Sequence, residues 1–470
     1  MTPRANEDRP LAALIVPDLI ELLEEHPESI GPQTEEMHPA DLADVAEALP
    51  EALVRAFLEA LPRERAAEVL EYLDEDLRTQ VLEELPAGEA AEIVAEMDPD
   101  ERADALEELD EETVDEILQE LEPDDKAETE RLLQYDPYTA GGLMTTEFVS
   151  VEETLTVEES LRAVRAMARA GRREAMYTIY TTDADGRLRG VLSLRELLAA
   201  PEGSRISEHA WTDVVSVVPD TPQEEVSQVT SNYDLVALPV VDRDKHLLGV
   251  VTVDDVIDVI QEEQTEDAQK FGGMEALEEP YMQITLWQNV RKRGGWLAVL
   301  ALSEMMTASV MARYEDELGR VLLLSQFIPL IMSSGGNSGS QATSLIIRAM
   351  ALGEVSLRDW WRVVVRELPA GFILGLLLGT LAMVRIVTWQ SLGLYNYGPH
   401  ATLLAATVGL TLISIVTIGS LTGSMLPFVL KRFGFDPASA SAPFVATIVD
   451  VSAISLYFSV AYLFLSGTLL

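Results

Sequence analysis

Cysteine is absent from the 470-residue sequence, which excludes disulfide bonds and thiolate metal sites. Basic residues are also scarce, because 33 lysines and arginines stand against 80 acidic residues and leave a formal net charge of −47. No basic face is available to neutralise phosphates, so we do not expect nucleic acid as a partner. The lysines are Lys126, Lys245, Lys270, Lys292 and Lys431.

The surplus of acids has two explanations, and both can hold at once. An acidic, lysine-poor surface keeps proteins hydrated and soluble in a halophilic host, and we expect this adaptation to account for most of the charge. The second explanation is sensing of divalent cations, which would need only a handful of the acids.

Long apolar runs are missing from the first part of the chain and dominate from Trp296 onward. The N-terminal residues lack a basic start followed by an apolar core, so no signal peptide is predicted. We therefore expect the charged part to stay in the cytosol and the apolar part to cross a membrane. The length allows three domains.

Residues 46–130 repeat every twelve residues, as in Leu-Glu-Ala-Leu-Pro at 58–62 and Leu-Glu-Glu-Leu-Pro at 82–86. Leucines three apart face one side of a helix, and the Pro or Asp ends one helix and starts the next. Helices of about two turns are not stable alone. Stacking them predicts an all-α superhelical domain with an acidic surface.

A tandem module follows, in which residues 182–193 match residues 241–252 at an offset of 59. Each copy reads as strand, polar turn, strand and helix. The pair resembles two CBS domains, α/β units that normally form one disc-like module. Such modules often bind adenine nucleotides and often dimerise.

The CBS family's ribose-binding pattern is Gly, two apolar residues, Ser or Thr, two residues and Asp. Residues 249–255 fit this pattern and make Thr252 and Asp255 candidate ligands of ATP, whereas the first copy ends in Glu196. An acid at this spacing is also an ordinary feature of a helix N-terminus. The residues alone do not decide between nucleotide binding and a simple helix cap.

The helix after the second copy is rich in acids, and Asp255, Asp258, Glu262 and Glu266 share one of its faces. Carboxylates at that spacing suit a hard cation. A solvated face of an acidic protein explains the same pattern, and on the residues alone it is the favoured explanation.

Five segments are long and apolar enough to be membrane spans. Basic residues gather before the first span, around the loop between the second and third, and in the loop between the fourth and fifth. This bias predicts a multi-pass protein of the plasma (inner) membrane with a cytosolic N-terminus and an external C-terminus. The spans are residues 296–313, 320–347, 364–388, 401–430 and 440–466; the opposite side carries Arg313, Arg320 and Arg385.

Two spans contain unusual residues. In the second, Pro329 and the Ser- and Gly-rich run at 333–341 predict a break in the helix, which is tolerated at membrane depth only where it is buried in protein or lines a wet cavity. In the fifth, Asp450 costs roughly 2.5–3.5 kcal/mol to insert, so it is a functional candidate, with a packing hydrogen bond as the alternative. Glu304 in the first span lies nearer one end and could reach water.

Magnesium gives up its water reluctantly and prefers octahedral oxygen ligands. One carboxylate with carbonyls and hydroxyls can hold the hydrated ion through its waters, as rings of acids do in cation pores. With five histidines and no cysteine, no cluster suits zinc or copper.

Several motifs together carry a resemblance over nearly the whole chain. They are His38-Pro39-Ala40-Asp41, Thr139-Ala140-Gly141-Gly142-Leu143-Met144-Thr145-Thr146, Gly335-Gly336-Asn337-Ser338-Gly339-Ser340-Gln341, and Pro443-Phe444-Val445-Ala446-Thr447-Ile448-Val449-Asp450. The chain resembles the MgtE family of magnesium channels or transporters. The resemblance implies a homodimer with a pore between the subunits and hydrated Mg²⁺ on Asp450, near the Ala446 backbone and Thr447.

The resemblance also implies a gate. The helix after the CBS pair would act as a plug, and high cytosolic Mg²⁺ would bind acids of the N-terminal domain, the CBS domains and the plug and so close the pore. The plug acids are Asp255, Asp258, Glu263, Glu266 and Asp267, and the expected pore-lining residues are Pro329, Gly335, Gly336 and Asn337. No acid of the N-terminal domain can be named from the sequence.

Two positions depart from the family. Ala442 stands where some relatives have Asn, and Glu304 replaces a small residue expected in the first span. We expect an N-terminal domain at 1–134, CBS domains at 135–203 and 204–264, a plug or connecting helix at 265–294 and a five-helix membrane domain at 295–470.

The leading hypothesis is a Mg²⁺-selective channel or transporter that admits Mg²⁺ to the cytosol and is closed by it. Alternatives are a less selective divalent pore that also passes cobalt or manganese, and a CBS nucleotide-sensing channel for another ion. An anion channel is disfavoured because the charged group deep in the fifth span is an acid. No nucleophile-and-base set or phosphate loop appears, so an enzyme is not expected.

Overall fold

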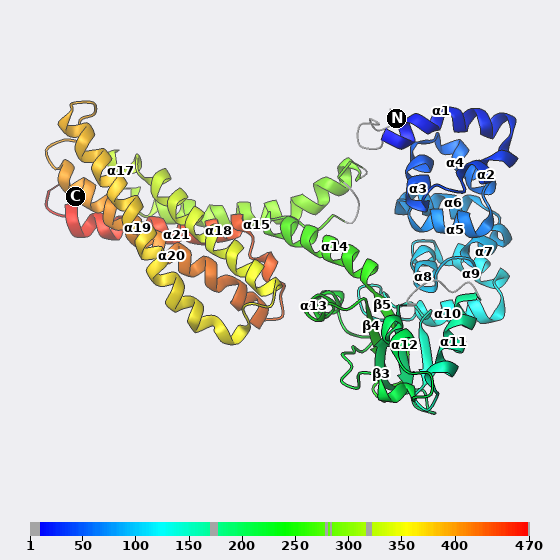
Figure 1. Cartoon of the computed structure of the whole chain (residues 1–470). Coiled ribbons are helices and arrows are strands. Elements are labelled where there is room, and N and C mark those ends of the chain that lie inside the picture. The colour runs from blue at the N-terminus through cyan, green and yellow to red at the C-terminus, as the bar shows by residue number, and fades with distance from the viewer. Residues whose placement is uncertain (1–9, 170–176, 278–280, 283, 316–321, 469–470) are drawn as a thin grey trace. The chain divides into compact units, whose positions relative to one another are not determined.

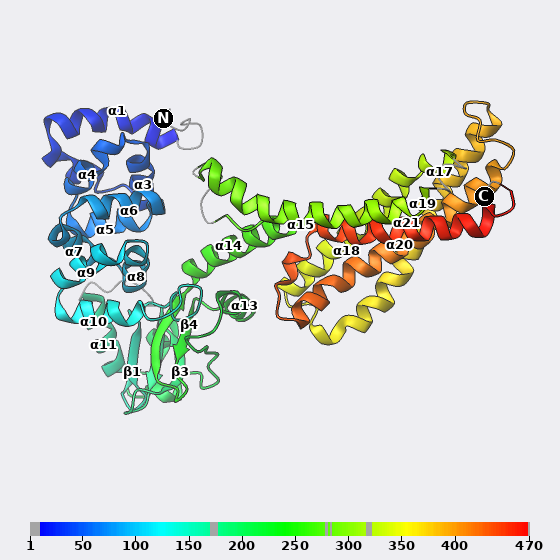
Figure 2. The ribbon, with the colours of Figure 1, turned by 180° about the vertical axis from the view of Figure 1, so that it is seen from behind.

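The computed structural model describes residues 10–169, 177–277, 281–282, 284–315 and 322–468. It divides into two compact units, residues 1–260 and 261–470, and the boundary passes through helix α14 (Val253–Phe271). Along the chain, Figures 1 and 2 show a stack of short helices, a mixed α/β module and a bundle of long helices. Arg320 and the predicted start of the second span lie outside the described residues.

Short helices at a twelve-residue interval build the first half of unit 1, which confirms the predicted superhelical domain. The residue before each of α4 to α9 is Pro or Asp, as the repeat requires. Two helices precede them, α1 (Pro10–Glu25) and α2 (Ile30–Thr34), with a 3₁₀ turn at Pro27–Ser29. The repeat helices are α3 (Pro39–Ala48), α4 (Glu51–Glu59), α5 (Arg63–Glu71), α6 (Glu75–Glu84), α7 (Ala87–Val94), α8 (Pro99–Glu107), α9 (Glu111–Glu120) and α10 (Pro123–Leu132).

The repeated leucines form the core of this stack. Leu58, Leu70, Leu82 and Leu106, each the first leucine of its unit, are buried. Alternate helices pack on one another, α3 on α5, α5 on α7 and α7 on α9, so a helix of about two turns is stabilised by neighbours rather than by its own hydrogen bonds.

The rest of unit 1 is the tandem α/β module, and its internal repeat is confirmed at the predicted offset. The first copy contains β1 (Val149–Glu152), α11 (Val157–Arg169), β2 (Thr178–Thr182), β3 (Leu188–Ser193) and α12 (Leu194–Ala199). The second contains α13 (Gln223–Tyr233), β4 (Ala237–Val241), β5 (Leu247–Thr252) and α14. Strand β1 is parallel to β2, β2 is antiparallel to β3, and β4 is antiparallel to β5.

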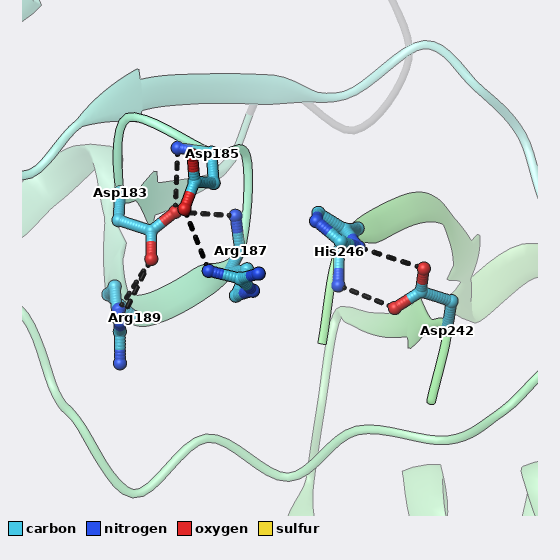
Figure 3. Close-up of polar contacts among 6 residues, drawn as sticks. All are labelled: Asp183, Asp185, Arg187, Arg189, Asp242 and His246. Atoms are coloured by element: carbon cyan, nitrogen blue, oxygen red, sulfur yellow. Dashed lines mark hydrogen bonds and ion pairs between the residues drawn. The ribbon is translucent and has the colours of Figure 1, made fainter. Parts of the chain in front are cut away.

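The polar turns of the two copies use the same chemistry, as Figure 3 shows. Asp183 accepts the backbone N–H of Arg187 at 2.9 Å, and Asp242 accepts the backbone N–H of His246 at 2.8 Å. An aspartate that bonds its own turn is a common way to fix such a loop. The turns also pair with each other, since the Leu188 N–H donates to the Lys245 carbonyl at 2.8 Å.

Unit 2 is helical and begins within α14, at residue 261. Its helices are α15 (Leu286–Ala312), α17 (Leu322–Ser325), α18 (Ile328–Ala351), α19 (Trp360–Ser391), α20 (Ala401–Arg432) and α21 (Ala442–Leu465). Among the described residues, four helical segments are long and apolar enough to cross a membrane, and they contain α15, α19, α20 and α21. Helix α18 is 24 residues long but rich in Ser and Gly, and it packs on α20 and α21.

The predicted break in the second span is wrong. Helix α18 is continuous from Ile328 to Ala351, and Pro329 sits in its first turn, where a missing N–H costs nothing. The glycines serve close packing instead of breaking the helix. An added Cβ at Gly419 would lie 2.4 Å from the Gly335 carbonyl oxygen, and one at Gly423 would lie 2.0 Å from the Gly339 carbonyl oxygen.

Facing pairs of small residues therefore let α18 and α20 approach with backbones in contact, as in small-xxx-small packing of membrane helices. Hydroxyls add bonds across the contact, since Thr343 Oγ1 donates to the Gly423 carbonyl at 2.9 Å and Ser338 Oγ donates to the Val416 carbonyl at 3.1 Å. The Ser and Gly composition that suggested a break is a packing signature.

Replacing Gly423 by alanine should destabilise the bundle, because the helices must separate to admit the methyl group. Overpacking of this kind costs about 1–3 kcal/mol, which lowers the thermal midpoint by roughly 5 °C. Gly294→Ala is the matched control, since nothing lies within 4 Å of its added Cβ. Thermal unfolding of the purified protein in detergent measures both, and equal midpoints for the two variants would contradict the assigned packing.

Candidate functional site

Helix α21 carries the predicted pore residues and begins at a well-defined cap. Ser441 Oγ accepts the Phe444 N–H at 3.4 Å and also the indole N–H of Trp296 at 3.2 Å. From this start, Ala446 and Asp450 lie one turn apart on the same face. Both residues are half-buried, and Thr447 Oγ1 donates to the Pro443 carbonyl at 3.0 Å.

Helix α18 packs directly on the segment of α21 that holds Asp450. An added Cβ on Gly336 would lie 3.3 Å from Ala446 Cβ, and one on Gly335 would lie 2.8 Å from Val449 Cγ1. The structure thus brings two of the predicted pore residues, Gly335 and Gly336, against α21 beside Asp450.

The other two predicted pore residues are not brought there by contacts within one chain. Asn337 is exposed, and its Nδ2 donates to Ser333 Oγ at 3.4 Å. Pro329 is exposed at the N-terminal turn of α18, six residues before Gly335.

A second cluster, the unit 1 acid cluster, lies within unit 1 and is formed by Glu71, Glu101, Asp104 and Asp255. Burial, with the charge of Asp104, raises the pKa of Glu101 to about 8. Burial raises the pKa of Asp104 to about 7 against the opposing effect of Arg78. Burial, together with Asp98, raises the pKa of Glu71 to about 7.

Asp255 belongs to this cluster although it lies on the first turn of α14. Burial raises its pKa to about 6, with a hydrogen bond from Thr252 opposing the shift. Its charge in turn helps to raise the pKa values of Glu101 and Asp104. Glu101 and Asp104 of the helical repeat therefore lie close enough to Asp255 at the start of α14 for their charges to repel one another.

The charge of the cluster is incompletely balanced. Arg78 is the base that lowers the pKa values of its acids, but its guanidinium is also paired with Glu108. In the described part of the chain, no three acids converge tightly enough to hold a bare metal ion.

The two candidate nucleotide ligands are bonded to each other, because Thr252 Oγ1 donates to Asp255 Oδ2 at 2.5 Å. The first copy has the same arrangement, with Ser193 Oγ donating to Glu196 Oε2 at 2.8 Å and a complete capping box. The structure is consistent with both a helix cap and a nucleotide site, because the residues cap a helix and still carry a hydroxyl and an acid at the spacing of the ribose pattern.

The five predicted plug acids all lie on α14, and the boundary between the two units falls among them. Asp255 and Asp258 belong to unit 1, whereas Glu263, Glu266 and Asp267 belong to unit 2. Helix α14 runs through the predicted domain boundary at 264 and ends at Phe271, and α15 begins at Leu286. A single separate helix over 265–294 is therefore not observed.

Lys270 links the end of α14 to the loop that leads into α21. Its Nζ lies 2.5 Å from Glu266 Oε1 and 2.7 Å from Asp436 Oδ2. Burial lowers the pKa of this ammonium, but the hydrogen bonds to Asp436 and Glu266 outweigh burial and raise it. Asp436 also caps the turn before α21, accepting the Ala438 N–H at 2.8 Å.

Lys270→Met should release the end of α14, because two acids would lose their shared cation while the apolar stem is kept. We expect faster hydrogen exchange at residues 266–271 and unchanged exchange in α19. Asp436→Asn should reproduce part of the change. Arg362→Met, which removes an exposed ion pair with Asp359, is the control. Unchanged exchange at the end of α14 in Lys270→Met would contradict the link.

Sequence reasoning missed the acids of the helical repeat. A signal was present, because Glu101 occupies the repeat position where Leu77 stands two units earlier, and Leu77 packs on the core. Glu101 and Asp104 are also three residues apart, which places them on one face of α8. Comparing units of the repeat with one another, and looking for acids at apolar positions, would have found them.

A bundle of apolar helices with an acid on a half-buried helix, joined to a CBS pair and an acidic helical domain, defines the class: a polytopic membrane transport protein with large domains outside its membrane part. Profiles of known families agree with each part. The profile described as a divalent cation transporter, MgtE, matches residues 328–460, the MgtE intracellular N domain matches 37–138, and CBS domains match 140–203 and 206–262.

The chain is 43% identical over 343 residues to a protein of Thermus thermophilus named magnesium transporter MgtE, covering 72% of this chain and 73% of that one. A protein of the same name from Enterococcus faecalis is 33% identical over 338 residues, covering 72% of each. The solved cytosolic domain of the Mg²⁺ channel MgtE in complex with ATP is 40% identical, with a TM-score of 0.50, covering 53% of this chain and 100% of that one. This chain belongs to the MgtE family of divalent cation transporters.

Proposed function

We propose that the protein is a Mg²⁺-selective channel or transporter that admits Mg²⁺ to the cytosol and is closed by Mg²⁺ bound to its cytosolic part. The observation that carries the transport half is Asp450, an acid on a membrane helix that packs against the glycines of α18. The relatives named as magnesium transporters support the choice of ion.

In this proposal Asp450 holds hydrated Mg²⁺ through its waters, with the Ala446 carbonyl and the Thr447 hydroxyl nearby. Magnesium keeps most of its water, so one carboxylate per chain is enough. Two copies in a homodimer would supply two carboxylates around one axis, with Asn337 and Pro329, both exposed in the single chain, facing the pore.

The proposed topology has five spans, a cytosolic N-terminus and an external C-terminus. Aromatic contacts support it, because Trp296, in the first half of α15, lies against Phe444, and Tyr314 just after α15 stacks on Phe458. Helices α15 and α21 therefore run in the same direction. Two parallel spans need an odd number of crossings between them, and in this proposal α18, α19 and α20 are those crossings.

The unit 1 acid cluster supports the part of the proposal that concerns gating. Glu101 and Asp104 of the repeat repel Asp255 of α14, so a divalent cation would relieve the repulsion and hold the two elements together. A cation that binds the closed state more tightly than the open state shifts the equilibrium toward the closed state. We further propose that the remaining plug acids Asp258, Glu263, Glu266 and Asp267 contribute, and that ATP binds at Thr252 and Asp255.

Uptake of Mg²⁺ into liposomes containing the purified protein tests the transport half. We expect uptake well above that of empty liposomes, and weak competition by cobalt or manganese. Equal uptake of the three ions would favour the less selective divalent pore. No uptake of any divalent ion would leave a CBS-regulated channel for another ion as the better proposal.

A further inference from the structure

Glu304 is an acid in the apolar part of α15 that the proposed mechanism does not use. It is exposed in the single chain. A carboxylate turned toward lipid at this depth is expensive, so an intramembrane acid normally faces a wet path or a partner. The question is what Glu304 faces.

Two aromatic contacts fix the register of α15 against α21. Trp296 lies against Phe444, with ring centroids 6.3 Å apart, and Tyr314 stacks on Phe458, with centroids 4.4 Å apart. Glu304 is eight residues after Trp296, and Asp450 is six residues after Phe444. At 1.5 Å per residue the two acids reach nearly the same level, about 12 Å and about 9 Å from the first contact.

The same register places Glu304 on α15 close enough to Asp450 on α21 for the two carboxylates to interact. From Trp296 onward, the half-buried or buried positions of α15 recur at helical spacing; they are Trp296, Leu300, Ser303, Thr307, Val310 and Met311, and Tyr314 continues the row just after the helix. Glu304 lies at the edge of the face that these positions form.

Thr307 supplies an independent sign of a ligand. Its side chain is 3% exposed, and its hydroxyl has no hydrogen-bond partner in the described part of the chain. A helical side chain leans over the turn that precedes it, which for Thr307 is the turn that contains Glu304. A buried hydroxyl without a partner is costly, and an ion or its water shell would satisfy it.

Resting on the proposed transport of Mg²⁺, we propose that Glu304 and Asp450 form a two-carboxylate site for a hydrated divalent cation, with Thr307 as a further oxygen ligand to its water shell. Two facing carboxylates carry a charge of −2, which a divalent cation balances fully. A monovalent cation would leave half of that charge uncompensated. Glu304 would then set the affinity of the ion path, while Asp450 remains its indispensable member.

The functional test is Mg²⁺ uptake by liposomes at varied external Mg²⁺. Glu304→Gln should raise the half-saturating Mg²⁺ concentration about tenfold, while its maximal uptake stays within about twofold of wild type. Glu304→Asp should restore most of the affinity, and Thr307→Val should shift it about twofold to threefold. Glu315→Gln removes the same charge beyond the end of α15 and should leave uptake unchanged.

A second readout does not depend on transport. Dicyclohexylcarbodiimide labels carboxylic acids in apolar surroundings, and mass spectrometry locates the label. Mg²⁺ should protect Glu304 in wild type, and protection should weaken in Asp450→Asn. The paired site alone would be overturned by three results together: wild type takes up Mg²⁺ normally, Glu304→Gln has the same half-saturating Mg²⁺ concentration as wild type, and Mg²⁺ does not protect Glu304 from labelling. Absent wild-type uptake with Mg²⁺-protected Glu304 would overturn the transport proposal and keep the site.

Discussion

Mg²⁺ uptake by liposomes should fall by on the order of a hundredfold when Asp450 is replaced by alanine. A hydrated ion can make two hydrogen bonds to the carboxylate, each worth about 1.5–3 kcal/mol, and 1.36 kcal/mol corresponds to a factor of ten. Asp450→Asn should lose nearly as much, because the amide keeps the shape but removes the charge. Asp450→Glu should retain measurable uptake.

The matched control is Ser459→Ala, which removes an exposed hydroxyl that bonds only the Ser455 carbonyl of its own helix, at 2.7 Å. Its uptake should equal that of wild type, and all variants should elute as wild type does in gel filtration. Normal uptake by Asp450→Ala would remove Asp450 from the ion path and leave Glu304 as the acid to examine.

Acidification should stabilise the contact between α8 and the first turn of α14, and Mg²⁺ should do the same at higher pH. The pKa values of Glu101, Asp104 and Asp255 are raised to about 8, 7 and 6 in the folded chain. The folded state therefore binds more protons than the unfolded state between about pH 4.5 and 8, so this contribution to stability is lost as pH rises through that range.

Glu101 alone should account for about 2 kcal/mol of this effect, or about thirtyfold in the rate of local opening. Hydrogen exchange of the full-length protein in detergent, corrected for the intrinsic pH dependence of exchange, measures it at α8 and at 253–258. In Glu101→Gln at pH 8, the amides of α8 and of 253–258 should exchange as slowly as those of wild type do at pH 6. Glu116→Gln, an exposed acid on α9, is the control. Exchange that becomes slower as pH rises, or that does not respond to Mg²⁺, would contradict the proposed repulsion among these acids.

The fold was largely predictable because local signals and packing agree in each part. The twelve-residue spacing determines where Pro or Asp stops a helix, and the leucines between them have one face to bury. The offset of 59 between residues 182–193 and 241–252 likewise predicts two copies of one strand-turn-strand unit. Such periodic signals are repeated many times, so a single ambiguous residue does not disturb them.

The break predicted in α18 shows where composition misleads. Ser and Gly weaken a helix in water, but in a bundle they let Gly335 and Gly339 meet Gly419 and Gly423. The partner glycines lie about 80 residues later in the chain, so spacing within one segment cannot reveal the pairing. Only the arrangement of helices separates a packing glycine from a breaking one.

The site was predictable only in part, for a related reason. Asp450 stands out because an acid is expensive inside a span, whereas one acid among the 80 of this chain does not stand out elsewhere. Partial burial distinguishes Glu101 and Asp104 from exposed acids such as Glu107 on the same helix, and burial depends on how the chain folds around α8. The dimer and the membrane orientation stay predictions.

The central claim is a pore that Mg²⁺ itself closes, and the most direct measurement is Mg²⁺ flux through liposome-embedded protein while Mg²⁺ on the N-terminal side is raised from micromolar levels to about ten millimolar. Flux through wild type should fall to the level of empty liposomes, and a Glu101→Gln, Asp104→Asn, Asp255→Asn variant should stay open. Wild-type flux that persists at high Mg²⁺ would contradict the gate and leave the cytosolic acids as an adaptation to salt.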